Sequence, residues 1–110
     1  MKNEAFERGR VLEVLRDNRG QYVSIAFMQL LRTCHLLNMP LSPEVLREHL
    51  EYLAEKRYID VTRRSELPGY KVSTLRSTER PDHIVAARLT TKGMDLLEAS
   101  ISDPAIEVIA

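Results

Sequence analysis

Apolar positions recur at the spacing of an α-helix in four segments of this chain, and they alternate as in a β-strand in two others. The two alternating segments lie between the third and the fourth helical segment and can pair as an antiparallel hairpin. The pattern therefore predicts helices at about residues 3–18, 24–37, 43–57 and 90–101, with strands at 58–64 and 84–90 before the last helix.

Capping residues mark the ends of these helices. Asn3, Ser24 and Thr90 carry side-chain oxygens that can accept hydrogen bonds from the first N–H groups of the first, second and fourth helices. Gly20 should end the first helix. Pro40 should end the second, because proline cannot continue the hydrogen-bond ladder of a helix.

The third helix has a well-marked start and two distinct faces. Ser42 is a side-chain cap, Pro43 suits the first helical position, and Glu44 complements the positive end of the helix. Leucines at i, i+4 and i+7 must face the core. On the opposite face we expect Arg47 to attract Glu51 and so offset the repulsion among the acids. The predicted core is Leu12, Leu15, Leu30, Leu46, Leu50 and Leu53, and the solvated face of this helix carries Glu44, Arg47, Glu48, Glu51 and Glu55.

Three smaller features have a structural interpretation. Gln21-Tyr22-Val23 is expected to add a short edge strand. Gly93 lowers helix propensity near the start of the last helix, which indicates close packing against another element. Cys34 lies in an apolar stretch and is expected to be a core residue. As the one cysteine of the chain it cannot form an internal disulfide, which agrees with a reducing compartment.

Length and composition are those of an ordinary globular domain. A chain of 110 residues with 44% hydrophobic and 29% charged residues can bury one modest core. No apolar run approaches the roughly 20 residues that span a bilayer, and the N-terminus lacks an apolar signal core. We therefore expect a cytoplasmic protein without a membrane segment, with a domain at residues 1–101 and a C-terminal tail at 102–110.

Charge is unevenly distributed, although the formal net charge of the chain is zero. The third helix, over residues 42–57, has a net charge of −1, whereas residues 61–88 carry six basic and three acidic residues, a net charge of +3. A basic hairpin is what contact with DNA phosphates requires, although a long solvated loop can also be charged for solubility alone. The basic residues of this segment are Arg63, Arg64, Lys71, Arg76, Arg80 and Arg88.

The order of elements resembles the winged helix-turn-helix superfamily, an α+β fold in which a three-helix core carries a β-hairpin wing and a C-terminal helix. The segment "LSPEVLREHLEYLAEKRYIDV" is similar to the recognition-helix segment of arsenic-repressor-type bacterial regulators. The similarity consists of a serine-capped helix with His49-Leu50 and Leu53. In size and plain architecture, the chain also resembles small winged-helix proteins carried by prophages.

A second motif resembles the same superfamily. The segment "RLTTKGMDLLEAS" is similar to the step from the wing into the last helix of multiple-antibiotic-resistance and phenolic-acid-decarboxylase type regulators, through Leu89, Thr90 and Gly93. The chain also departs from the pattern. Arg57 stands where such regulators often have a glycine, Glu48 occupies a position that usually faces the groove, and the clustered cysteines of metal-sensing members are missing.

No residue set in the sequence has the spacing of a catalytic or metal site. His35, His49 and His83 fall on three separate predicted elements, and no His-x-x-x-His or Cys-x-x-Cys pair exists. The four glycines are scattered and form no phosphate-binding loop. We therefore expect neither an enzyme nor a metal or cofactor, and we expect His49 to be a helix-packing residue.

The resemblance implies a DNA-binding transcriptional regulator that reads duplex DNA with the helix at 43–57 and a basic wing. The alternative is a winged-helix protein–protein interaction module without DNA binding, which the zero net charge and the acidic helix face favour. The predicted DNA-binding residues are Ser42, Glu44, Arg47, Glu48, Arg63, Arg64, Lys71, Arg76 and Arg80.

Self-association is also expected, because one short helix with few basic residues offers little affinity for a duplex. A homodimer would bind two half-sites of a pseudo-palindromic sequence. Alternatively, the tail folds back onto its own domain. The predicted dimer interface comprises the apolar residues without an obvious partner in the chain, namely Phe6, Ile101, Ile106, Val108 and Ile109.

Overall fold

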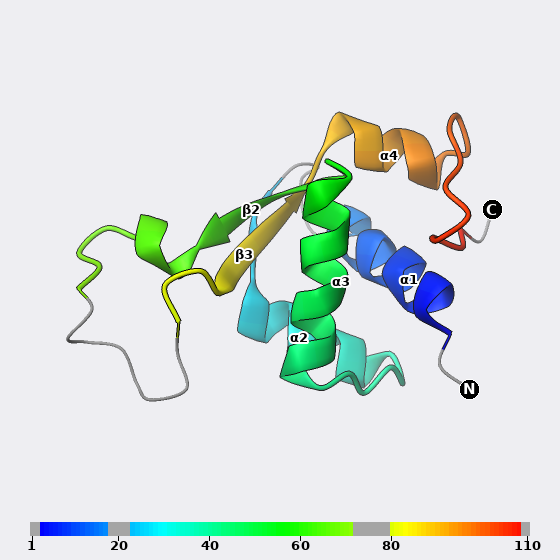
Figure 1. The fold of residues 1–110 in the computed structure, drawn as a ribbon. Coiled ribbons are helices and arrows are strands. Elements are labelled where there is room, and N and C mark those ends of the chain that lie inside the picture. The colour runs from blue at the N-terminus through cyan, green and yellow to red at the C-terminus, as the bar shows by residue number, and fades with distance from the viewer. Residues whose placement is uncertain (1–2, 18–22, 72–79, 109–110) are drawn as a thin grey trace.

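The computed structural model of the protein describes residues 3–17, 23–71 and 80–108. Over these ranges it is a mixed α+β structure with four α-helices and a three-stranded antiparallel sheet (Figure 1). The helices are α1 (Glu4–Asp17), α2 (Phe27–Leu36), α3 (Pro43–Glu55) and α4 (Thr91–Leu97), the strands are β1 (Ile25–Ala26), β2 (Ile59–Arg63) and β3 (Ile84–Leu89), and a 3-10 turn, η1 (Arg64–Glu66), follows β2.

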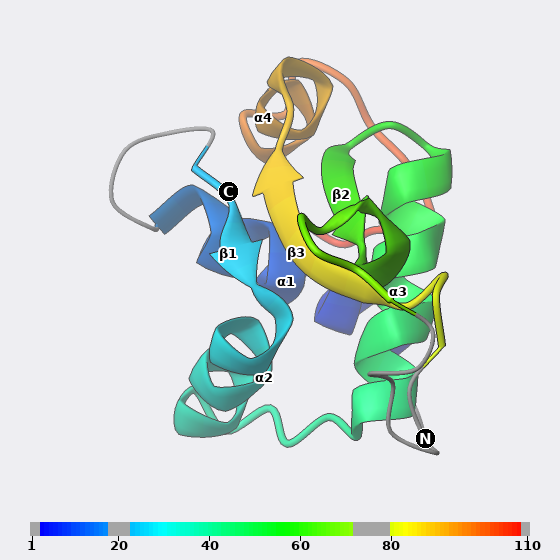
Figure 2. The same ribbon diagram turned by 90° about the vertical axis from the view of Figure 1, so that its left-hand side faces the viewer.

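The sheet has the strand order β1-β3-β2, so that β3 lies in the centre (Figure 2). Strands β2 and β3 form the predicted antiparallel hairpin, with Val61 opposite Ala87. The register shifts between Thr62 and Arg63, where the hairpin leaves the body of the domain. In Figure 1 the hairpin projects to one side of the helices, past α3.

The predicted leucine core is confirmed. Helix α1 contacts α2, α3, α4 and β3, and the buried side chains fill the space between these elements. Cys34 is fully buried in the same cluster, as expected. The six leucines named from the sequence are at most 2% exposed, namely Leu12, Leu15, Leu30, Leu46, Leu50 and Leu53.

Three of the predicted caps are also confirmed. The side chain of Asn3 accepts from the N–H of Phe6 at 3.0 Å, and that of Ser42 accepts from the N–H of Val45 at 3.2 Å. Thr90 accepts from the N–H of Gly93 at 3.1 Å. A Cβ on Gly93 would lie 2.2 Å from the carbonyl oxygen of Tyr58, so this glycine is required for close packing of α4 on the start of β2.

The start of the second helix was predicted wrongly. Ser24 does not cap it, because α2 begins at Phe27 and its N-cap, Ala26, makes no side-chain cap bond. The two residues before Phe27 instead form β1, with the buried Ile25 opposite Ala87 of β3. Pairing with a distant strand therefore overrides the local capping signal. The predicted edge strand was placed too early, since Val23 precedes β1, and Gln21 and Tyr22 lie outside the described residues.

Two helix ends also differ from the sequence pattern. Helix α4 stops at Leu97, and Ala99 beyond it has a positive φ of 61°, so Ile101 lies outside the helix rather than on its apolar face. Helix α3 stops at Glu55, and Arg57 follows with a positive φ of 67°. The left-handed conformation favours glycine, so Arg57 carries strain of the order of 1–2 kcal/mol.

The buried stripe of α3 gives a direct stability prediction. Leu50→Ala should lower the free energy of unfolding by about 2–5 kcal/mol, because it removes a fully buried side chain and leaves a cavity. The matched control is Glu55→Ala on the exposed side of the same helix, which should change the value by no more than about 0.5 kcal/mol. Urea denaturation of both variants measures the difference, and equal effects would show that the stripe does not carry the core.

Candidate nucleic-acid interface

The predicted contact residues of α3 cluster at its N-terminal end. Ser42, Glu44 and Glu48 are exposed there. Arg47 is half-buried, and its guanidinium lies over the ring of Phe27 from α2, 4.8 Å from the ring centroid. Its Nε is buried and has no hydrogen-bond partner among the described residues. Arg47 is therefore positioned by stacking, with its other guanidinium nitrogens available for a ligand.

A groove of about 690 Å³ opens beside Arg47, between the start of α2, the start of α3 and the base of the β2–β3 hairpin. We call it the hairpin groove. Its basic lining residues come from three elements: Arg47 from α3, Arg64 from η1, and His83 from the start of β3. Its remaining wall is mostly apolar, with one acid, and consists of Ala26, Phe27, Met28, Pro43, Glu44, Leu67, Ile84 and Val85.

The pKa of His83 is affected by several of these positive charges. Burial and the charge of Arg47 lower the pKa of His83 below its ordinary value of 6.5, and Arg80 and Arg64 lower it further. Asp82 opposes the shift, with an effect smaller than that of Arg47 but larger than those of Arg80 and Arg64. Three arginines that lie far from one another in the sequence thus act on the imidazole of His83. The hairpin groove is consequently a place where an anion would be favoured.

The guanidinium of Arg63 is engaged in an ion pair. Its guanidinium forms a bidentate ion pair with Glu51 of α3, at 2.8 and 2.9 Å, and also donates to the carbonyl oxygen of Asp82 at 2.8 Å. The hydrogen bond from Arg63 holds the pKa of Glu51 below its ordinary value. The expected attraction between Arg47 and Glu51 is therefore replaced by one between Arg63 and Glu51, which ties the hairpin to α3.

The other basic residues of the hairpin are placed as follows. Lys71, on the arm of the hairpin that follows β2, and Arg80, on the arm that precedes β3, are exposed. Arg76 lies outside the described residues. Arg88 on β3 pairs with Asp60 on β2 at 2.8 Å. Arg47, Arg64 and Arg80 thus all act on His83, whereas the charges of Arg63 and Arg88 are paired with Glu51 and Asp60.

The residues predicted for a dimer interface do not form one free surface. Ile106 is 5% exposed and belongs to the hydrophobic core, and Val108 packs against that core. The expectation that both lack partners within the chain is therefore wrong, because the C-terminal segment folds back onto α1. Phe6 is half-buried, Ile101 is 36% exposed, and Ile109 lies outside the described residues. Self-association itself stays a prediction.

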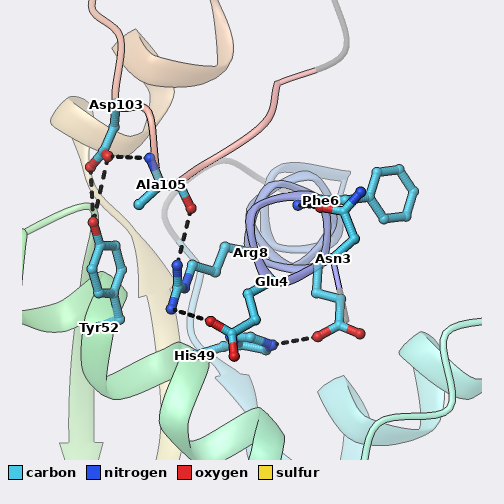
Figure 3. A network of polar contacts seen from close by, with 9 residues as sticks. Asn3, Glu4, Phe6, Arg8, His49, Tyr52, Asp103 and Ala105 are labelled. Atoms are coloured by element: carbon cyan, nitrogen blue, oxygen red, sulfur yellow. Dashed lines mark hydrogen bonds and ion pairs between the residues drawn. The ribbon is translucent and has the colours of Figure 1, made fainter. Parts of the chain in front are cut away.

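Backbone contacts hold this C-terminal segment on α1. The N–H of Glu107 donates to the carbonyl oxygen of Ala5 at 2.9 Å. The side chain of Arg8 donates to the carbonyl oxygen of Ala105 at 3.1 Å (Figure 3). At Gly9 the two backbones come so close that a Cβ would collide with the carbonyl oxygen of Glu107. The guanidinium of Arg8 also lies 4.2 Å from the centroid of the Tyr52 ring, so it joins the segment to α3.

Asp103 is the centre of the polar contacts in this region. It accepts from the Tyr52 hydroxyl at 3.4 Å and from the N–H of Ala105 at 2.9 Å (Figure 3). It also accepts from the Tyr58 hydroxyl at 2.9 Å. Burial alone would raise the pKa of Asp103, but these hydrogen bonds outweigh it and hold the pKa below the ordinary value of 3.8. Burial and the contact with Asp103 raise the pKa of Tyr58 to about 12.

His49 is buried, as a packing residue should be, but it also makes a polar contact that the sequence did not reveal. Its Nε2 lies 2.8 Å from a carboxylate oxygen of Glu7 on α1, and the His49 side chain is 3% exposed. The resemblance to arsenic-repressor-type regulators, in which the matching position is structural, was the basis for expecting His49 to be a packing residue. Its partner is 42 residues away in sequence, and no local signal could have identified it.

The described residues contain no group of three or more His, Cys, Asp or Glu side chains placed to hold a metal ion. Burial raises the pKa of the Cys34 thiol to about 11, so this thiol is not a nucleophile at neutral pH. Within the same residues, none of the helices has the length and apolar character that crossing a membrane requires. Comparison of the chain with family models, with curated proteins and with solved structures gave no match.

The Asp103 contacts predict a pH-dependent contribution to stability. Because the pKa of Asp103 is lowered in the folded state, its contribution is present above the ordinary value of 3.8 and is lost as the pH falls through the lowered pKa. Asp103→Asn should therefore lower the free energy of unfolding at pH 7 by about 1–2 kcal/mol, with the deficit shrinking towards pH 2.5.

Urea denaturation at several pH values measures this deficit, with Glu98→Gln on the exposed end of α4 as the control of equal charge change. An Asp103→Asn deficit that is absent at pH 7, or that stays constant down to pH 2.5, would contradict the assigned role of Asp103.

Proposed function

We propose that the protein is a DNA-binding transcriptional regulator of the winged helix-turn-helix type. The observation that carries this proposal is the hairpin groove, which is lined by Arg47 from the start of α3 and by Arg64 and His83 from the base of the hairpin. Arg80 lies next to this groove, in contact with His83. A phosphate backbone that passes between a recognition helix and a wing needs cations on both elements. The groove supplies them despite the zero net charge of the chain.

The order of elements supports the same proposal. A helix pair, α2–α3, is followed by the antiparallel hairpin β2–β3 and the last helix, and a short strand before α2 completes the sheet in the order β1-β3-β2. In a domain of this kind α3 would enter the major groove with its N-terminal residues, and the hairpin would follow the phosphates. The proposed protein acts in the cytoplasm as a homodimer on two half-sites about one helical turn apart.

The proposed contacts with DNA fall into two groups, those to base edges and those to the phosphate backbone. Base edges would be read by the exposed start of α3, where Arg47 can donate to guanine and the carboxylates of Glu44 and Glu48 can accept from the amino group of cytosine. The backbone would be held by Ser42 and by the basic residues of the hairpin. The phosphate contacts proposed from the hairpin are Arg63, Arg64, Lys71, Arg76 and Arg80, of which Arg63 would first have to leave Glu51.

A second candidate function is favoured by the acidic face of α3. Glu44, Glu48 and Glu55 are exposed, and in the described part of the chain no ion pair neutralises them. Carboxylates on the helix that would face the duplex repel a polyanion, whereas they suit a basic protein partner. A winged-helix domain that binds another protein rather than DNA is therefore the alternative.

Charge removal in the hairpin groove distinguishes the two functions. Arg64→Gln and Arg80→Gln should each weaken binding to all duplexes and reduce the salt dependence by about one unit of slope, as loss of one phosphate contact does. Arg88→Gln is the matched control, since Arg88 is paired with Asp60 outside the groove and its loss should leave the slope unchanged. Fluorescence anisotropy at several salt concentrations measures the slopes. If the wild-type protein binds no duplex even at low salt, the proposed DNA binding is wrong and the alternative, a domain that binds another protein, is favoured.

The acidic face of α3 gives an independent prediction about specificity. Glu48→Gln and Glu55→Gln each remove one exposed negative charge, so both should strengthen binding to arbitrary duplexes. Glu48, nearer the start of α3, should also lose its preference for a cytosine-bearing pair, whereas Glu55 at the far end should not affect base preference. Selection from a random duplex pool with each variant measures both effects, and identical selected sequences for the two variants would contradict the assignment of Glu48.

A further inference from the structure

Among the described residues that line the hairpin groove, His83 is the one titratable group that can change charge near neutral pH. Charged groups face it from three elements: Arg47 and Glu44 from α3, Arg64 from η1, and Arg80 and Asp82 from its own segment. The α2 residues of the groove, Phe27 and Met28, carry no charge. The imidazole therefore lies among three arginines and two carboxylates, on an otherwise apolar wall.

The contacts of the ring favour its neutral form in the free protein. The N–H of Arg80 points at Nδ1 of His83 at 3.4 Å, so Nδ1 serves as an acceptor, which leaves the ring proton on Nε2. The backbone holds the ring in place, because the N–H of His83 donates to the carbonyl oxygen of Arg80 at 3.1 Å and the N–H of Arg64 donates to that of His83 at 2.9 Å. The surplus of positive charge around the ring acts in the same direction.

We propose that His83 couples DNA binding to proton uptake, so that the protein holds a duplex more tightly as the pH falls. A phosphate group that enters the hairpin groove would cancel the repulsion between the arginines and a protonated imidazole. Protonation would then place one more positive charge beside that phosphate, and Nδ1 would give up the hydrogen bond that it accepts from the N–H of Arg80. This inference rests on the proposed DNA binding and specifies how that same site is regulated.

The direction of the effect follows from linkage. Burial lowers the pKa of His83 most in the free protein, and repulsion by the arginines lowers it further. A bound phosphate cancels this repulsion, so we expect the pKa of His83 to be higher in the complex than in the free protein. Between these two values the complex binds a proton that the free protein does not, and affinity rises as the pH falls. One coupled proton limits the change to about tenfold in dissociation constant per pH unit.

The test is the affinity of the full chain for a labelled duplex between pH 5.5 and 8 at constant ionic strength, measured by fluorescence anisotropy. For the wild type we expect the dissociation constant to fall with falling pH, with a slope of up to about tenfold per unit. His83→Gln should flatten this profile. His35→Gln is the matched control, because His35 is exposed on α2 outside the groove, and this variant should keep the wild-type slope.

A second measurement needs no variant. NMR titration of the histidine ring signals should show a higher midpoint for His83 in the complex than in the free protein. Equal midpoints, or a His83→Gln profile as steep as that of the wild type, would overturn the proton coupling while leaving DNA binding intact. No binding by the wild type at any pH and at low salt would overturn the proposed function and this inference together.

Discussion

The burial of one face of α3 is the constraint on which the rest of the structure depends. Leu46, Leu50 and Leu53 are fully buried against the remaining helices and the sheet. A helix with a core stripe of this kind has no freedom to rotate, so the face opposite the stripe must be presented outward. The positions of the exposed acids and of Arg47 are therefore consequences of core packing, and any function of that face is set by where the leucines lie.

Polar contacts then fix α3 against its neighbours on three sides. His49 joins it to Glu7 of α1, Tyr52 joins it to Asp103 of the C-terminal segment, and Glu51 joins it to Arg63 of the hairpin. The last of these contacts has a functional consequence, because it holds the hairpin at a defined position relative to α3. The hairpin groove exists between two elements that are tied together, so its cations are already in place before any ligand arrives.

Much of the fold was predictable, because it is encoded locally. The cap at Ser42, the leucine spacing of α3 and the alternation of the hairpin strands each determine an element without reference to the rest of the chain. The errors occurred where distant residues decide the outcome. Ile25 is in a strand because Ala87 of β3 lies opposite it, and Ile106 is in the core because α1 offers it a surface.

Less of the candidate site was predictable, because it depends on contacts between distant residues. The sequence located the basic segment, but it could not show that Arg63 and Arg88 would be paired with Glu51 and Asp60. Nor could it place His83 among Arg47, Arg64 and Arg80, since these four residues come from three separate elements. The register of the hairpin and the packing of α3 determine which basic residues line the groove.

DNA binding by the hairpin groove is tested most directly by mapping where a duplex touches the protein, from the amide NMR spectrum of the chain during titration with DNA at low salt. If the groove binds DNA, the shifts concentrate at the start of α3 and at the base of the hairpin, around Arg47, Arg64 and His83. A spectrum that does not change, or shifts confined to α1 and the C-terminal segment, would contradict the claim that the hairpin groove binds DNA.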